Sequence, residues 1–175
     1  GYTTSDAIGA IKSTFNYQSN QMVSLLKGTN MRAIDIASNI KSKYGESNQA
    51  IVNLLKQAGF NIPEIGDVMK TTLGITRGSD AVVILKRASV SKTEVINIMK
   101  SKYNYSAGTM AKTLKNAYNM SALDVAKQLK STYNASVNTV ASALRNGANY
   151  SIADCISAIR NVFNVGLVQA RKLFN

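Results

Sequence analysis

The sequence lacks histidine and holds only one cysteine, one proline and nine acidic residues among 175. Without histidine it has neither the commonest general base nor the commonest neutral metal ligand, and no serine can form a Ser-His pair. The single cysteine, Cys155, excludes an intramolecular disulfide. One proline and eleven glycines leave little turn chemistry for an all-β fold. We therefore predict a non-enzymatic protein without catalytic residues, cofactor or metal site.

Long apolar runs are also missing. The longest runs from Ala81 to Leu85, whereas a membrane helix needs roughly 20 such residues. No secretory signal is visible at the start of the sequence. We therefore expect no transmembrane segment, and both a cell-surface or extracellular setting and a cytoplasmic one fit the composition.

The charge is strongly one-sided, with 21 Lys and Arg residues giving a net charge of +12 in 18.8 kDa. A charge of this size concerns solubility and attraction to polyanions rather than the fold. It makes nucleic acid, anionic polysaccharide, anionic lipid or an acidic protein surface the plausible partners.

An apolar residue followed by Lys or Arg recurs through the chain in two series. The first has a spacing of 29 or 30 residues and comprises Ile11-Lys12, Ile40-Lys41, Met69-Lys70, Met99-Lys100, Leu129-Lys130 and Ile159-Arg160. The second trails it by 15 or 16 residues and comprises Leu26-Lys27, Leu55-Lys56, Leu85-Lys86, Leu114-Lys115 and Leu144-Arg145. Each repeat therefore contains two similar segments, A and B, of about 15 residues.

Segment A carries the start and stop signals of a helix. Nine residues before its Lys or Arg stand Thr3, Arg32, Asn61, Ser91, Ser121 and Ser151, and three residues after these stand Asp6, Asp35, Glu64, Glu94, Asp124 and Asp154. This spacing resembles a capping box. Arg32 is the exception, and Thr29 or Asn30 is the alternative cap there. Segment A ends at Asn16, Gly45, Gly74, Asn104, Asn134 and Asn164, residue types that tolerate a left-handed turn.

Apolar residues of each segment recur at offsets that form one stripe of a helix. The first core column of segment A is Ala7, Ile36, Ile65, Val95, Val125 and Cys155, and the Leu column of segment B ends with Phe174. Neither helix could bury its stripe alone, and the short connections force antiparallel neighbours. We predict an all-α fold, an α-solenoid of six tandem two-helix repeats with about twelve helices.

This organisation predicts one helical-repeat domain over residues 1–175. Its repeats lie approximately at 3–31, 32–60, 61–90, 91–120, 121–150 and 151–175. Terminal repeats normally carry a polar outer face, yet Phe174 occupies a core column. We therefore expect either a longer array or ends that associate with each other.

The sharpest candidate site is the cation ladder, formed by the cations of the two series. It comprises Lys12, Lys27, Lys41, Lys56, Lys70, Lys86, Lys100, Lys115, Lys130, Arg145 and Arg160. It could bind an anionic partner, or its cations could complement the dipoles of their own helices. Tyr44, Tyr103 and Tyr133 are expected to pack, whereas Tyr17, Tyr105, Tyr118 and Tyr150 are expected in connections, where they are freer for recognition. Cys155 is expected to be a small core residue.

The opening of segment A, as in Ser121 to Val125, is similar to the first helix of the transcription-activator-like DNA-binding repeats. Those repeats are longer and carry a Gly-Gly loop that Tyr103 to Ala107 and Tyr133 to Ser136 lack, so no residue role is transferred. Our first hypothesis is a binding or scaffold module whose cationic face engages an acidic macromolecule. The second is a spacer, adhesin stalk or filament subunit that associates end to end, and sequence-specific DNA binding ranks third.

Overall fold

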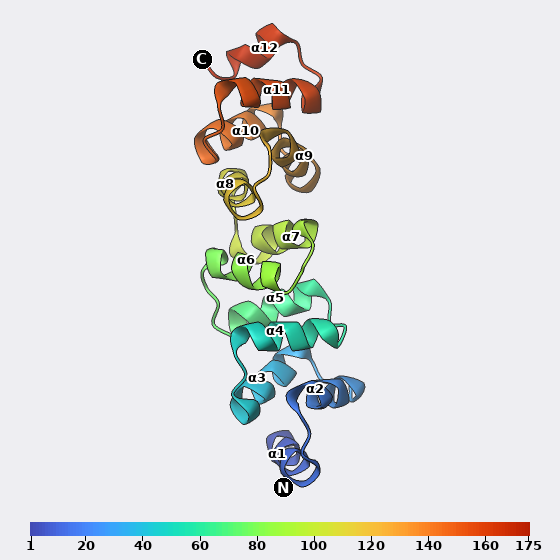
Figure 1. Ribbon diagram of the computed structural model, residues 1–175. Helices are drawn as coiled ribbons and strands as arrows, with labels where there is room; N and C mark the ends of the chain where they lie inside the picture. The colour runs from blue at the N-terminus through green and yellow to red at the C-terminus, as the bar shows by residue number, and fades with distance from the viewer. The chain divides into compact units, whose positions relative to one another are not determined.

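The computed structural model describes all 175 residues, which form twelve α-helices and no strand (Figure 1). This confirms the predicted all-α class. The helices gather into two compact units, residues 1–98 and 99–175, and the boundary falls within helix α7. None of the helices combines the length and the apolar character that crossing a membrane would require.

Segments A and B correspond to the odd- and even-numbered helices, called A and B helices below. Unit 1 holds α1 (Thr4–Phe15), α2 (Ser19–Gly28), α3 (Ala33–Tyr44), α4 (Asn48–Gln57), α5 (Ile62–Thr71), α6 (Gly78–Arg87) and the start of α7 (Lys92–Tyr103). Unit 2 holds α8 (Ala107–Tyr118), α9 (Ala122–Tyr133), α10 (Val137–Ser142), α11 (Ile152–Phe163) and α12 (Leu167–Lys172). Like helices pack on like, as α9 on α11 and α2 on α4.

The helix starts follow the predicted capping chemistry. The side-chain oxygens of Thr3, Asn61, Ser91, Ser121 and Ser151 each accept from the backbone N–H three residues later. The predicted end residues all have positive φ, between 49° and 66°, and five of them directly follow their helices, whereas α5 ends at Thr71, three residues before Gly74. Local sequence therefore sets most boundaries of the A helices.

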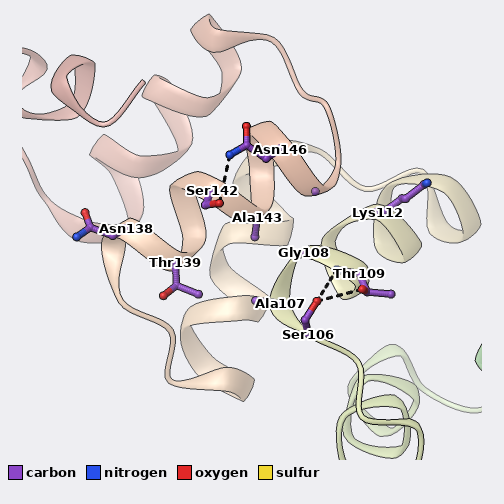
Figure 2. A pocket seen from close by; sticks show the side chains of 11 residues that line it. Ser106, Ala107, Gly108, Thr109, Lys112, Asn138, Thr139, Ser142, Ala143 and Asn146 are labelled. Atoms are coloured by element: carbon purple, nitrogen blue, oxygen red, sulfur yellow. Dashed lines mark hydrogen bonds between the residues drawn. The ribbon is translucent and has the colours of Figure 1, made fainter. Parts of the chain in front are cut away.

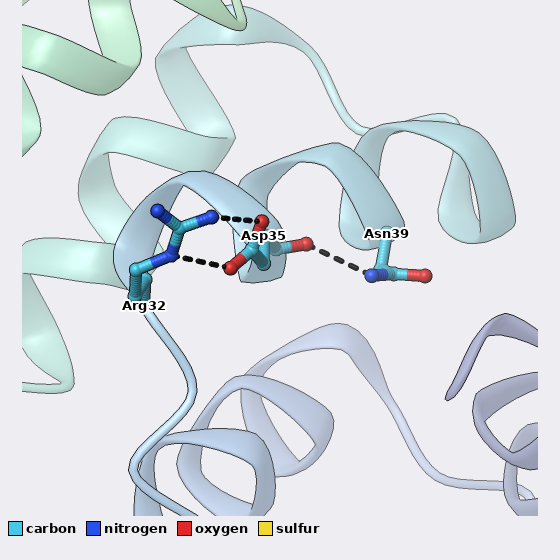
Figure 3. Close-up of polar contacts among 3 residues, drawn as sticks. All are labelled: Arg32, Asp35 and Asn39. Carbon is cyan, nitrogen blue, oxygen red and sulfur yellow. Dashed lines mark hydrogen bonds and ion pairs between the residues drawn. The ribbon is translucent and has the colours of Figure 1, made fainter. Parts of the chain in front are cut away.

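Helix α3 begins differently from the prediction. Arg32 itself is the N-cap residue and offers no side-chain cap, whereas its guanidinium forms a two-pronged ion pair with Asp35 (Figure 3). Thr29 and Asn30 do not cap α3, since Thr29 donates its hydroxyl to the Leu26 carbonyl and Asn30 lies in the left-handed region. Asp35 is thus held by Arg32 rather than by a capping hydroxyl.

The predicted core columns are buried. Ile36, Ile65, Val95, Val125 and Cys155 are all 0% exposed, as are four leucines of the B column, Leu55, Leu85, Leu114 and Leu144. The prediction was wrong for Ala7, which is exposed because no helix packs on that side of α1 within residues 1–175. Phe174 is only partly buried.

Helix α10 does not continue as a regular α-helix. Residues Ala143–Gly147 form a π turn, called η1, in which the Ala148 N–H donates to the Ala143 carbonyl five residues back. Here Gly147 lies against Gly108 of α8, where a Cβ on Gly147 would sit 2.6 Å from the Gly108 Cα. A side chain at 147 would therefore collide with the α8 backbone.

Candidate functional site

The cation ladder connects each helix to the next helix of the same kind. In α9, the Lys130 ammonium donates to the Val162 carbonyl at 2.8 Å and lies 4.9 Å from the centre of the Phe163 ring. Both partners belong to the end of α11. The lysine thereby supplies a donor to a helix end whose carbonyls have none within the helix, and it gains a cation–π contact.

The same contact recurs in both units. Lys12 donates to the Lys43 carbonyl at 2.5 Å, Lys27 to Ala58, Lys56 to Ser89 at 3.1 Å, Lys100 to Thr132 at 2.8 Å, and Lys115 to Ala148 and Asn149, each at 3.0 Å. Four of these lysines lie over rings, Lys12 over Tyr44, Lys27 over Phe60, Lys100 over Tyr133 and Lys115 over Tyr150. A helices bind A helices in this way, and B helices bind B helices.

The remaining ladder residues differ among themselves. Arg145 donates to the Tyr150 carbonyl five residues along the chain, and Lys70 and Lys86 also have partners. Lys41 and Arg160 are exposed and make no hydrogen bond or ion pair. The helix that follows Lys41, α5, ends at Thr71 before the aromatic position, which is Leu73, whereas no A helix follows Arg160 within residues 1–175.

This arrangement gives the ladder a role that the sequence analysis did not include. Six of its eleven cations donate to carbonyls at or just after the C-terminal end of a helix in the following repeat. A lysine ammonium has three N–H groups, and one or two of them are used by carbonyls here. The ladder as a site for an acidic partner stays a prediction.

Positive charge is concentrated in the second unit. Residues 99–175 contain ten Lys and Arg residues against two acids, whereas residues 1–98 contain eleven against seven. The two acids of the second unit, Asp124 and Asp154, accept hydrogen bonds from the Ser121 and Ser151 hydroxyls at helix starts. The exposed cations Lys112, Lys127 and Lys172 make no hydrogen bond or ion pair.

A groove of about 890 Å³ lies between α8 and the α10–η1 segment of unit 2 (Figure 2). Its walls carry hydroxyl and amide groups, among them Ser106, Thr109, Asn138 and Asn146, with Lys112 as the only charged residue. Figure 2 shows the Ser106 hydroxyl turned toward Thr109, and a hydrogen bond from Asn146 to Ser142. The groove presents hydrogen-bonding groups and one cation, and no carboxylate.

A second cavity of about 600 Å³ lies along α11 and α12. Two arginines, Arg160 and Arg171, line it together with Ile156, Asn161 and Leu167, and no acid is present. This cavity therefore carries two guanidinium groups without a carboxylate to neutralise them. Guanidinium groups favour planar anionic partners and aromatic faces.

The tyrosines mostly serve the packing between repeats. Tyr44 and Tyr133, at the ends of A helices, donate their hydroxyls at 2.9 Å to the carbonyls of Tyr17 and Tyr105 in the preceding repeat. The expectation that Tyr150 is a freer aromatic was wrong. Tyr150 is only 8% exposed and donates to the Met120 carbonyl at 2.5 Å. It lies beneath Lys115, which explains why its ring is covered.

Cys155 is a core residue, as predicted. It is 0% exposed, and its thiol contacts the Tyr150 carbonyl at 3.8 Å. Burial raises the pKa of this thiol to about 11. Such a thiol stays protonated at neutral pH and is a poor nucleophile.

Comparison with known proteins gives no family for this fold. No family model, curated protein or solved structure matches this chain. The resemblance of the Ser121–Val125 opening to DNA-binding repeats is confined to helix capping, where the Ser121 oxygen accepts from the Asp124 N–H at 3.1 Å. Only the charges and contacts of this chain indicate its function.

Proposed function

We propose that this chain is a non-enzymatic helical-repeat module that binds an acidic macromolecule, chiefly through residues 99–175. The observation that supports this proposal is the excess of ten Lys and Arg residues over two acids in that unit. Since Asp124 and Asp154 are engaged at helix starts, little negative charge is left to offset the cations. A polyanion is attracted to such a surface over distances of about 8–10 Å at ordinary salt.

Exposed cations outside the ladder are the residues expected to bind first. Lys112 lines the groove beside α8, and Lys127 and Lys172 lie on α9 and α12 without a partner. The ladder lysines of this unit, Lys100, Lys115 and Lys130, retain N–H groups that a phosphate, sulfate or carboxylate could accept from. Contacts of both kinds would add to the affinity.

The test measures binding of labelled duplex DNA, single-stranded nucleic acid and an anionic polysaccharide across a salt series. A triple variant, K112E/K127E/K172E, is expected to lose at least about tenfold in affinity and to give a shallower dependence on log salt. The matched control, R77E/R87E/K92E, changes the net charge equally but in unit 1, at exposed residues without a partner. It is expected to lose no more than about threefold.

Two results would contradict the proposal. Absence of binding to all three polyanions near physiological salt would exclude a polyanion as the partner and leave an acidic protein surface as the partner to test. Equal losses for the two triple variants would show that net charge alone, rather than the second unit, accounts for binding.

The ladder needs its own probe, because reversing Lys100 or Lys130 would also weaken the contact between repeats. Lys41 is exposed and unpaired, so K41E changes the charge of the ladder without removing a packing contact. A clear loss of polyanion affinity in K41E would support the ladder as a site. Unchanged affinity would indicate that the ladder cations serve the packing between repeats and not the binding of a polyanion.

The second candidate function is end-to-end self-association, as in a spacer, stalk or filament subunit. Six of the seven exposed large apolar side chains lie in the first and last repeats or next to them: Tyr2, Phe15, Leu25, Ile152, Leu167 and Val168. Apolar surface gathered in this way favours association. It supports a contact between copies without identifying a biological setting.

A further inference from the structure

One contact between A helices has the same form in three pairs of helices. A ladder lysine donates to the carbonyl next to the aromatic residue that ends the following A helix, and its ammonium lies over that ring. The three pairs are Lys12 with Lys43 and Tyr44, Lys100 with Thr132 and Tyr133, and Lys130 with Val162 and Phe163. Ring distances in these pairs are 4.5, 5.0 and 4.9 Å.

This contact joins a ladder cation to a carbonyl and an aromatic ring. In the first repeat the carbonyl and ring are present without a cation, and in the last repeat the cation is present without them. Helix α1 ends in Thr14 and Phe15, and no ladder cation reaches them; Phe15 is 68% exposed. Its counterparts Tyr44, Tyr133 and Phe163 are partly buried. Helix α11 carries Arg160, which is exposed and has no carbonyl or ring to bind.

The apolar surfaces beside Phe15 on α1 and beside Arg160 on α11 are also incompletely covered. On α1, Ala7, Ile11 and Phe15 are spaced by four residues and form one incompletely covered stripe. On α11, Ile156 is partly exposed, whereas its counterparts Ala37 and Ala126 are 0% exposed beneath a following repeat. The cavity beside Ile156 and Arg160 runs along the face that such a repeat would cover.

We propose that the α11–α12 face of one copy binds α1 of a second copy, with Arg160 donating to the Thr14 carbonyl and lying over the Phe15 ring. This proposal rests on the second candidate function, self-association, and not on an acidic partner. The occupant is a second copy because α1 supplies both features that these three contacts between A helices use, a carbonyl next to a terminal aromatic ring. A guanidinium suits both, since it donates in its plane and stacks on aromatic faces.

Arg171 sets the expected strength of this contact. Other B helices have a small apolar residue at the corresponding position, and Val23, Val52, Ala111 and Ala141 there are 0–2% exposed. In α12 the position is occupied by exposed Arg171. Covering an arginine costs free energy unless its charge stays hydrated, so we expect reversible association that strengthens in R171V.

Sedimentation velocity of the 175-residue chain over a concentration series reaching about 1 mM tests the proposal. The unchanged chain is expected to show a concentration-dependent shift to larger species. R160E and F15S are each expected to weaken association at least about tenfold, whereas R160K retains most of it. The control K127E alters an exposed, unpaired cation on α9 and is expected to leave association unchanged.

A mixing experiment checks the pairing of the two faces. R160E retains an intact α1 face and F15S an intact α11–α12 face, so an equimolar mixture is expected to form dimers although neither variant associates alone. Circular dichroism of each variant confirms that helicity is unchanged, as expected for exposed positions. A strictly monomeric unchanged chain would overturn both self-association and this contact. Association that R160E and F15S leave intact would overturn the contact alone, and neither result bears on polyanion binding.

Discussion

Gly147 of the π turn lies directly against Gly108 of α8, and the two positions tolerate a methyl group very differently. A Cβ on Gly147 would stand 2.6 Å from the Gly108 Cα and 2.7 Å from its carbonyl oxygen. A Cβ on Gly108 would stand 3.7 Å from the Gly147 Cα, which is an ordinary contact. The asymmetry arises because the Cβ of residue 147 points at the α8 backbone, which cannot move aside as a side chain can.

This difference predicts opposite effects of two alanine substitutions. G147A is expected to destabilise the second unit by about 1–3 kcal/mol, because backbone must shift to admit the methyl group. G108A is expected to be neutral or slightly stabilising, since alanine favours helix over glycine by up to about 1 kcal/mol. Urea unfolding of the two variants beside the unchanged chain measures both effects. Equal stability of G147A and G108A would contradict the close approach.

Loss of a ladder cation is expected to weaken the contact between repeats. K130M removes the hydrogen bond to the Val162 carbonyl and the contact with Phe163, and should cost about 1 kcal/mol. K127M, on the same helix, removes an exposed cation without a partner and is expected to cost no more than about 0.5 kcal/mol. Chemical unfolding compares the two variants. If they prove equally stable, the ladder contact contributes nothing measurable.

Helix capping gives a third prediction. S121A and S151A each remove the hydroxyl that accepts from the N–H of Asp124 or Asp154, and each is expected to cost about 1 kcal/mol. S131A serves as the control, because the Ser131 hydroxyl donates only to the Gln128 carbonyl of its own helix. The thermal unfolding midpoint of S131A should be close to that of the unchanged chain, and the midpoints of S121A and S151A should be lower.

Stability is expected to fall in alkali, starting with Cys155. Burial raises the pKa of its thiol from 9.0 to about 11 and the pKa of the Tyr133 and Tyr150 phenols from 10.0 to about 12. Between these pH values the folded chain holds protons that the unfolded chain releases. The contribution of these groups to the free energy of unfolding is therefore complete below about pH 9 and is lost as the pH rises toward 12. Urea midpoints measured from about pH 8 to 11 should decline, and the decline should be smaller in C155A.

The thiol also offers a chemical check. A thiol-specific reagent at about pH 8 is expected to modify Cys155 only in urea-unfolded chains, because the folded thiol is covered and protonated. Rapid modification of the folded chain would show that the repeat around α11 opens readily.

Helix capping was largely predictable because it depends on residues a few positions apart. Ser121 with Asp124 marks the start of α9, and Asn134 marks its end, in agreement with the structure. Arg32 was the exception, since an ion pair with Asp35 takes the place of a capping hydroxyl there. The sequence also placed Cys155 in the core, because its column holds Ile and Val in other repeats.

The candidate site was less predictable, because side-chain partners come from other repeats. The spacing located the ladder cations but did not indicate that Lys130 reaches Val162, 32 residues away. Tyr150 lies in a connection as predicted, but it is not free for recognition, because it donates to the Met120 carbonyl and lies beneath Lys115. The π turn at Ala143–Gly147 likewise left no signal in the spacing of the repeats.

The sequence by itself determined the period of the repeats, most helix boundaries and the apolar stripes, since these follow from hydrogen bonding and burial within about one helix. Only the tertiary structure decided what the ladder cations do. A lysine stem is long enough to reach either solvent or a neighbouring helix end, and the choice depends on which carbonyls and rings the packing brings within its reach.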